Sequence, residues 1–267
     1  MSFDDVRVTR VSSSAFQRVA AAPMTVVAHR GAPALAPENT ILAQEIGRRS
    51  GGVFIENDVR LSRDRVPFLM HDPTVDRTTD GVGKISELSA AQLRGLDAGS
   101  WLAPVFAGAR VPTLAEQLAD LRTRGGSLLL EIKETDSMED VAAVVDVVRA
   151  EEMTGRVVIQ SFDPQHLRWV RQLAPEIPLG LLRPKLDADP VAVSQELGLA
   201  LYNPSGVALE ARPSVVADLH AAGLGVWVWT VDTAEQWSRY EGYGVDGLIT
   251  NRAGELTGWL SGRGAGR

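Results

Sequence analysis

Residues 25–31 read TVVAHRG, a short apolar run that ends in a histidine, an arginine and a glycine. The same arrangement returns at 53–58 (VFIEND), 66–72 (VPFLMHD) and 128–133 (LLLEIK), where each apolar run leads into ionisable side chains. In a fold of parallel strands and helices, the carboxyl ends of the strands meet on one face, where catalysis takes place. These four runs therefore predict one shared site.

The alternation of strand and helix patterns predicts the fold. We expect strands at residues 25–29, 53–58, 128–132, 157–161, 179–182, 200–203, 225–230 and 246–250. Helical patterns accompany them at 38–49, 113–124, 137–151, 164–174, 190–197, 212–221, 233–240 and 252–260. Eight such units in a chain of 267 residues are typical of an α/β protein with a (β/α)8 TIM barrel.

The main alternative is a doubly wound open sheet. That fold places a glycine-rich phosphate loop after its first strand, but here Gly31 is followed by Ala32 and Pro33. The chain also has no internal repeat and no low-complexity linker. We therefore expect a single barrel domain over residues 1–267, with residues 1–23 as an N-terminal extension.

One connection is abnormally long. Residues 59–112 separate the second strand from its helix, far more than a usual strand-to-helix loop. The segment contains a strand-like piece at 66–70 and a short helical pattern at 89–93. We interpret it as a small lobe inserted after strand 2 on the catalytic face, where such insertions shape access to the site.

Composition excludes several functions. The chain has 0 cysteines, which rules out a thiolate nucleophile and a cysteine-ligated metal. Its net charge of -7 argues against nucleic-acid binding, which needs a basic surface. No run of apolar residues is long enough to cross a membrane, so we expect no stable membrane insertion. The N-terminus makes a poor signal peptide, and we expect a cytoplasmic protein.

Three carboxylates end two of the strands. Glu56 and Asp58 lie two residues apart, so their side chains share one face of a strand, and Glu131 ends the next strand. Such carboxylates can also cap helices or pair with arginines. Three together, without cysteine, suit a hard divalent ion such as Mg²⁺ or Ca²⁺.

Two of the four histidines, His29 and His71, close apolar runs. An isolated histidine usually has a structural role, but two at neighbouring strand ends beside a cation favour an acid/base pair. One would take a proton from the attacking oxygen and the other would protonate the leaving group. Arg30 and Lys133 supply positive charge that suits a phosphoryl group, and Lys133 can also pair with Glu131.

Three further residues are candidates for substrate binding. Glu38 opens the first predicted helix, where the helix dipole alone explains an acidic residue. Its position shortly after His29 makes it a site candidate as well. Phe162 and Trp229 follow strands on the catalytic face; aromatic rings in barrels usually serve packing, but at these positions they can form a pocket wall.

Together these residues resemble the glycerophosphodiester phosphodiesterase family from about Val26 to Asn251. The motifs that carry the resemblance are His29-Arg30-Gly31, Pro37-Glu38-Asn39-Thr40, Glu56-x-Asp58, His71-Asp72, Glu131-Ile132-Lys133, Ser161-Phe162, Trp229-Thr230 and Gly244-Val245-Asp246-Gly247. The resemblance implies a barrel with a small lobe after strand 2.

The resemblance also implies residue roles. A divalent metal would be held by Glu56, Asp58 and Glu131. The general acid and base would be His29 and His71. Phosphate contacts would come from Arg30 and Lys133, with Glu38 as a further site residue.

Two positions depart from the family pattern. The residue between the paired carboxylates is usually apolar but here is Asn57, which we expect to point away from the metal. The last strand usually ends in Thr-Asp but here ends in Thr250-Asn251, with one negative charge fewer near the barrel mouth.

The function that we predict is metal-dependent hydrolysis of a small-molecule glycerophosphodiester to sn-glycerol 3-phosphate and an alcohol. The alternatives are a phospholipase D-like hydrolase acting on lysophospholipids and a catalytically inactive phosphodiester-binding barrel. The sequence leaves open whether water attacks directly or a glycerol hydroxyl attacks first. It also leaves the oligomeric state open.

Overall fold

The computed structural model of this protein describes residues 13–19 and 22–264. Residues 1–12 and 20–21, most of the predicted N-terminal extension, lie outside the described part, so the extension stays a prediction. Among the helices of the described part, none is both long and apolar enough to cross a membrane.

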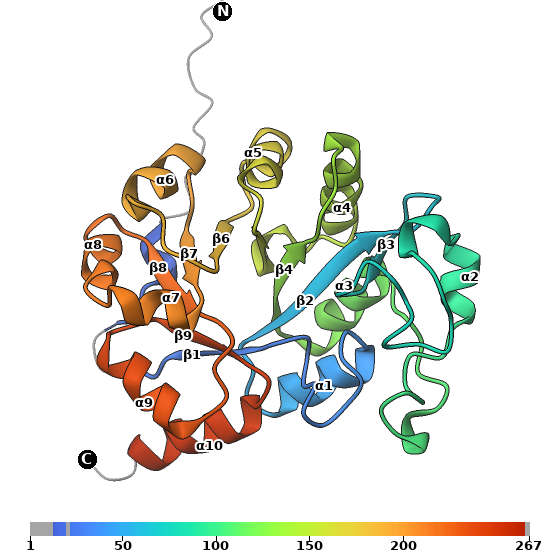
Figure 1. The fold of residues 1–267 in the computed structure, drawn as a ribbon, viewed down its shortest axis with the longest axis horizontal. Helices are drawn as coiled ribbons and strands as arrows, with labels where there is room; N and C mark the ends of the chain where they lie inside the picture. The colour runs from blue at the N-terminus through green and yellow to red at the C-terminus, as the bar shows by residue number, and fades with distance from the viewer. Residues whose placement is uncertain (1–12, 20–21, 265–267) are drawn as a thin grey trace, which may run out of the picture.

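Eight parallel strands close into a barrel (Figure 1). They are β1 (Thr25–Ala28), β2 (Phe54–Leu61), β4 (Ser127–Ile132), β5 (Val157–Ser161), β6 (Leu179–Arg183), β7 (Leu201–Pro204), β8 (Gly225–Val228) and β9 (Gly247–Thr250). Each strand pairs with its neighbour, and β1 pairs with both β9 and β2, which closes the ring. The predicted barrel is confirmed, and the open-sheet alternative is wrong.

Helices between the strands surround the barrel (Figure 1). They are α1 (Ile41–Arg49), α3 (Leu114–Arg124), α4 (Met138–Ala150), α5 (Pro164–Leu173), α6 (Pro190–Leu197), α7 (Gly206–Ala211), α8 (Val215–Ala221), α9 (Ala234–Gly242) and α10 (Ala253–Gly264). A capping box begins α3: the Thr113 side chain accepts from the Glu116 backbone N–H, and the Glu116 side chain accepts from the Thr113 backbone N–H. The predicted helix 212–221 begins later, at Val215, because Arg212 has a non-helical backbone ahead of Pro213 and residues 213–214 form a turn.

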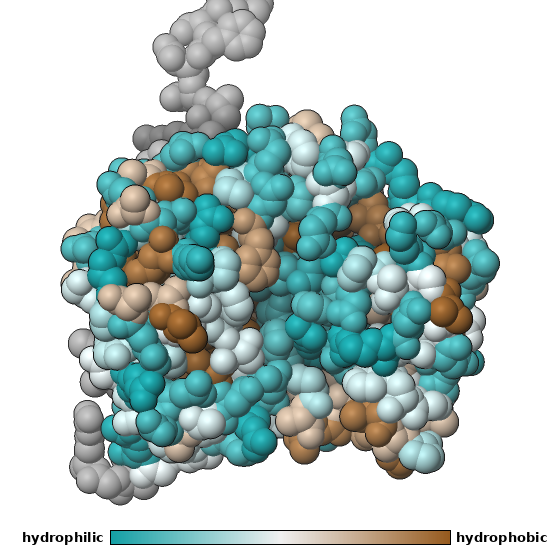
Figure 2. All heavy atoms as spheres, viewed as in Figure 1, coloured by the Kyte–Doolittle hydropathy of each residue, from teal (hydrophilic) through white to brown (hydrophobic). Residues whose placement is uncertain are grey.

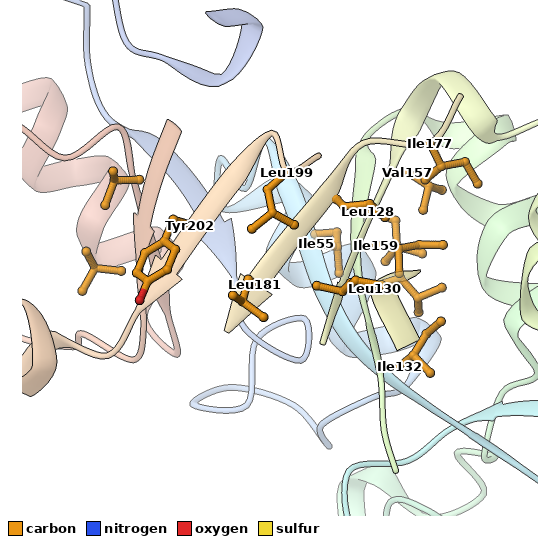
Figure 3. Packing of buried hydrophobic residues seen from close by; sticks show 14 of the residues in the cluster. Ile55, Leu128, Leu130, Ile132, Val157, Ile159, Ile177, Leu181, Leu199 and Tyr202 are labelled. Carbon is orange, nitrogen blue, oxygen red and sulfur yellow. The ribbon is translucent and has the colours of Figure 1, made fainter. Parts of the chain in front are cut away.

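Successive side chains along each strand point to opposite faces, so the core has two layers. Side chains on the outer face of the barrel, such as Ile55, Leu128 and Ile159, pack beneath the helices (Figure 3). Side chains of the opposite register fill the lower interior of the barrel: Val27, Leu129, Val158, Leu201, Trp227 and Ile249. The 3-10 helix η1 (Ser13–Phe16) covers this interior from below, since Phe16 packs edge-on against Trp227 at 5.9 Å between ring centroids.

The inserted lobe follows β2, as predicted. Strand β3 (Pro67–Leu69) pairs antiparallel with β2, and η2 (Ile85–Glu87), α2 (Ala90–Gly95) and η3 (Pro104–Phe106) complete the lobe beside the barrel (Figure 1). The lobe has a small apolar core of its own that includes Phe68, Val75 and Leu93. It positions the C-terminal end of β3 close to the barrel mouth. The assignment of the whole chain to one domain with the boundaries 59–112 for the lobe stays a prediction.

Candidate active site

A sharp turn after β1 brings the first site residues over the barrel. Arg30 and Gly31 both have positive φ, at 48° and 89°. Only glycine fits at position 31, because a Cβ there would lie 2.6 Å from a backbone carbon of Ala43. The turn directs the Arg30 backbone N–H to Glu56 Oε2 at 3.0 Å and leaves His29 at the end of the strand. Left-handed backbone at a non-glycine residue is strained, and such strain is concentrated at functional sites.

The three predicted carboxylates meet inside the barrel. One oxygen each of Glu56, Asp58 and Glu131 lies within 4.8 Å of the others, and all three residues are buried. Burial and the neighbouring carboxylates raise the pKa of Glu56 well above its usual range and that of Glu131 to about 8. Burial opposes ionisation of Asp58 too, but Lys133 and Arg30 outweigh it and hold the pKa of Asp58 below its usual range.

Two cationic side chains contact this carboxylate cluster. Lys133 Nζ lies 2.6 Å from Glu131 Oε1 and 3.0 Å from Asp58 Oδ1, so the pairing of Lys133 with Glu131 is present. Burial alone would lower the pKa of Lys133, but Asp58 and Glu131 raise it above its usual value, and the side chain stays an ammonium. Arg30 Nε lies 3.5 Å from Asp58 Oδ2 and makes no hydrogen bond within the described part of the chain. The Arg30 Nε–H therefore lies beside the Asp58 carboxylate without a full hydrogen bond.

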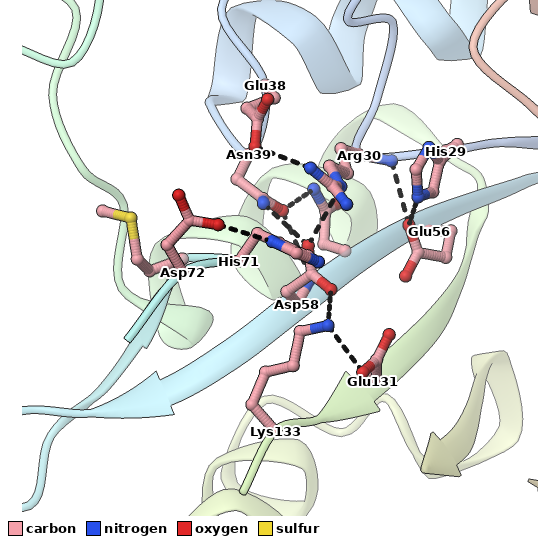
Figure 4. A network of polar contacts seen from close by, with 12 residues as sticks. His29, Arg30, Glu38, Asn39, Glu56, Asp58, His71, Asp72, Glu131 and Lys133 are labelled. Atoms are coloured by element: carbon pink, nitrogen blue, oxygen red, sulfur yellow. Dashed lines mark hydrogen bonds and ion pairs between the residues drawn. The ribbon is translucent and has the colours of Figure 1, made fainter. Parts of the chain in front are cut away.

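The two predicted imidazoles approach the carboxylate cluster from two sides (Figure 4). His29 Nε2 lies 3.9 Å from Glu56 Oε2, and His29 Nδ1 lies 2.7 Å from Asn251 Oδ1. Burial, with help from Arg30, lowers the pKa of His29 to about 4, which makes the ring neutral at pH 7. His71 follows β3, and its Nδ1 lies 2.7 Å from Asp72 Oδ1. One imidazole thus has an amide partner and the other a carboxylate.

Glu38 lies in a loop rather than in a helix, so the predicted helix 38–49 begins too early. Asn39 has a φ of 55°, which is incompatible with a right-handed helix, and Thr40 is the N-cap of α1. The Glu38 carboxylate instead accepts hydrogen bonds from Arg30 at 3.0 Å and from Arg77 at 2.8 Å. The carboxylate thus lies just before the N-cap of α1 and beside the phosphate candidate Arg30.

Arg77 is a residue of this network that the sequence reasoning missed. It comes from the lobe and also donates to Asp72 Oδ2 at 2.6 Å. This contact is the main reason that the pKa of Asp72 falls to about 2. Arg77 thus joins the lobe to the β1–α1 loop through Glu38 and keeps the partner of His71 ionised. No sequence spacing predicts this role of Arg77, because its partners Asp72 and Glu38 lie in two different strand-to-helix connections.

Asn57 points out of the barrel, as expected, and belongs to a chain of buried amides. Gln117 on α3 donates to Asn57 Oδ1, and Asn57 Nδ2 donates to Asn39 Oδ1 at 2.7 Å. Asn39 Nδ2 then donates to Asp58 Oδ2 at 2.9 Å. The side-chain oxygens of Asn57 and Asn39 each accept from an amide N–H, so this part of the chain has one direction and fixes the orientation of the Asp58 carboxylate.

The predicted aromatic pair lies on the same face. Phe162 follows β5 and Trp229 follows β8, and their rings meet edge to face with centroids 5.3 Å apart. Trp229 Nε1 donates to the Asn203 carbonyl at 2.7 Å, which fixes the indole, while Phe162 is 39% exposed. The pair therefore lies at the carboxyl ends of β5 and β8, and its role as a pocket wall stays a prediction.

The fold and the site together define a class of protein. The carboxyl ends of the strands form a hollow lined by hydrophilic side chains at the centre of the molecular face in Figure 2. In it lie buried carboxylates, two fixed cations and two imidazoles, the groups that binding and cleaving a phosphate ester require. The class is that of barrel hydrolases acting on phosphate esters.

Comparisons with known proteins identify the family. The model of the glycerophosphoryl diester phosphodiesterase family matches residues 29–255. A glycerophosphodiester phosphodiesterase of Caldanaerobacter subterraneus is 33% identical over 230 residues, which cover 85% of this chain and 93% of that protein. The solved structure of an Oleispira antarctica phosphodiesterase in complex with the product sn-glycerol-3-phosphate has a TM-score of 0.84 at 28% identity, and the match covers 90% of this chain and 97% of that chain. This chain belongs to the glycerophosphoryl diester phosphodiesterase family, and the predicted resemblance is confirmed.

Proposed function

We propose that this enzyme hydrolyses a glycerophosphodiester to sn-glycerol 3-phosphate and an alcohol with the help of a divalent metal ion and two histidines. The observation that carries the proposal is the placement of His29 and His71 on two sides of the cluster formed by Glu56, Asp58 and Glu131. The related phosphodiesterase that binds sn-glycerol-3-phosphate supports the same substrate class.

The chemistry of the donors fits a metal ion. Within the described part of the chain, three buried carboxylates face two cationic side chains, so the site has room for further positive charge. Oxygen donors alone suit Mg²⁺ or Ca²⁺. We propose Glu56, Asp58 and Glu131 as the residues that hold the ion. When bound, such an ion stabilises negative charge on the phosphoryl oxygens.

The side chains of the protein would carry out the remaining steps. Arg30 and Lys133 bind the phosphoryl oxygens and orient the phosphorus toward the attacking oxygen. In a direct attack, one imidazole takes a proton from water as the new P–O bond forms. The other gives a proton to the alcohol oxygen as the old P–O bond breaks. Glu38, held by Arg30 and Arg77, is placed to accept a hydrogen bond from a glycerol hydroxyl.

Histidine variants test this assignment. His29→Ala and His71→Ala are each expected to lose about 100-fold or more in kcat on glycerophosphocholine, because each removes a proton-transfer group. Far-ultraviolet circular dichroism should show an unchanged fold. His220→Ala is the matched control, because His220 contacts Asp246 at the opposite, N-terminal end of β9. Turnover like that of the unmodified enzyme in either site variant contradicts the acid/base roles.

A lysophospholipid substrate is the second candidate. The observation in its favour is that large apolar side chains on the lobe are exposed, among them Val82 at 77%, Trp101 at 37% and Val105 at 81%. Turnover of lysophosphatidylcholine, compared with that of glycerophosphocholine, distinguishes the two. The lipid candidate requires faster turnover of the lipid and a loss of that preference in Val105→Ser. The absence of nucleic-acid binding and the cytoplasmic location stay predictions from composition.

A further inference from the structure

Asp232, in the connection after β8, accepts hydrogen bonds from Thr250 and Asn251, and Asn251 in turn contacts His29. Asp232 Oδ1 accepts from the Asn251 backbone N–H at 2.8 Å and from the Thr250 hydroxyl at 2.9 Å. Its Oδ2 accepts from Asn251 Nδ2 at 2.6 Å. The other side-chain atom of Asn251, Oδ1, lies 2.7 Å from His29 Nδ1. The four residues therefore form one continuous chain of hydrogen bonds.

The chemistry of the groups gives this chain one direction. An ionised carboxylate only accepts hydrogen bonds, so the amide nitrogen of Asn251 must face Asp232. The opposite orientation would place a carbonyl oxygen against a carboxylate oxygen with no proton between them. The Asn251 carbonyl must then face His29, and a carbonyl also only accepts. His29 Nδ1 is therefore the protonated ring nitrogen.

We propose that Asp232 is a positioning residue that fixes the tautomer of His29 through Asn251. With the proton on Nδ1, the lone pair of the neutral ring lies on Nε2, the atom that faces the carboxylate cluster 3.9 Å from Glu56 Oε2. His29 then enters the reaction as a proton acceptor at Nε2. This inference rests on the proposed role of His29 in proton transfer, while the tautomer itself can be measured without any activity.

The arrangement explains the departure at the end of β9. An aspartate at position 251 would accept from Nδ1 directly, with its charge in contact with the imidazole. Here the amide of Asn251 transmits the same direction of hydrogen bonding, and the charge lies one side chain further away, on Asp232. The tautomer is therefore kept with a neutral amide, instead of a carboxylate, in contact with the ring.

Asp232→Asn is the informative substitution, because it should reverse the direction of the hydrogen bonds between residue 232, Asn251 and His29. The new side chain has one oxygen, which the Thr250 hydroxyl and the Asn251 backbone N–H continue to occupy. Its amide nitrogen then faces the Asn251 side chain and requires a carbonyl there. Asn251 turns over and offers an N–H to His29 Nδ1, which moves the ring proton to Nε2 and removes the lone pair from the site.

The measurement is nitrogen-15 NMR of the histidine ring nitrogens, with kinetics on glycerophosphocholine beside it. We expect the Nδ1–H tautomer in the unmodified enzyme and the Nε2–H tautomer in Asp232→Asn. We also expect kcat to fall at least about tenfold while KM changes less than about twofold, as when the orienting partner of a functional group is lost. An unchanged His29 tautomer in this variant overturns the proposal.

A swapped variant separates positioning from simple loss of structure. Asp232→Asn combined with Asn251→Asp has the same composition and charge as the unmodified chain. Its carboxylate at position 251 can accept from both His29 Nδ1–H and the new amide at 232, so we expect the Nδ1–H tautomer and most of kcat to return. A swapped variant that folds but retains the Nε2–H tautomer contradicts the inference.

Asp189→Asn is the matched control, since Asp189 is an exposed N-cap of α6 and asparagine caps equally well. We expect it to change neither the tautomer nor the kinetics. Failure of the proposed function gives a different pattern. In that case His29→Ala keeps full turnover, whatever the tautomer of His29 in the other variants.

Discussion

Glu131→Gln should stabilise the protein in the absence of metal, although it removes a proposed metal ligand. Burial and the Asp58 carboxylate raise the pKa of Glu131 from 4.5 to about 8. Between these values the folded chain binds more protons than the unfolded chain, so stability falls as the pH rises. Each pH unit in this window corresponds to about 1.4 kcal/mol, which sets an upper limit of about 5 kcal/mol above pH 8.

Glutamine removes the charge and leaves Lys133 paired with Asp58 at 3.0 Å. In chelator at pH 8.5 we therefore expect a gain of about 2–5 kcal/mol, or roughly 5–10 °C in Tm, that disappears near pH 4.5. The assay is thermal unfolding followed by circular dichroism at both pH values. Glu134→Gln is the control, because Glu134 is exposed and should change stability by less than about 0.5 kcal/mol. Equal or lower stability of Glu131→Gln at pH 8.5 would show that the buried charge of Glu131 does not destabilise the fold.

Two further substitutions test the surroundings of the site. Asn57→Leu leaves the buried Gln117 amide without its acceptor and should destabilise the protein by about 1–3 kcal/mol in urea unfolding. Because it also frees the chain of amides that orients Asp58, we expect weaker binding of the divalent ion by calorimetry, and unchanged affinity would disprove that link. Phe162→Ala removes one ring of the pair with Trp229 and should raise KM roughly tenfold with little change in kcat, since the wall binds substrate and transition state alike. A fall in kcat alone would place Phe162 elsewhere in the mechanism.

Much of the fold follows from local patterns. Eight predicted strands agree with the barrel strands to within two residues at most ends, because each is a short apolar run that the barrel buries. The short helix α7 was not predicted, since six residues are too few to show a helical period and its N-cap Ser205 gives only a weak signal. The early start predicted for α1 failed at Asn39, whose left-handed backbone is stabilised by its contacts with Asp58.

The candidate site was predictable where one rule applied: ionisable residues at the carboxyl ends of strands come together. That rule located His29, Glu56, Asp58 and Glu131. Applied more widely, it would also have found Asp232, which lies shortly after β8. Contacts that depend on how separate connections meet in space gave no such signal. The pairing of Arg77 with Glu38 is one case, since the lobe and the β1–α1 loop have no shared sequence pattern.

All the proposed residue roles depend on one activity, cleavage of a glycerophosphodiester on the alcohol side of the phosphorus. Phosphorus NMR of glycerophosphocholine, incubated with the enzyme and Mg²⁺ or Ca²⁺ and again with excess chelator, tests it most directly. We expect a signal of sn-glycerol 3-phosphate that grows with the metal and is absent in chelator. Release of phosphocholine, or no hydrolysis with either ion, would contradict it.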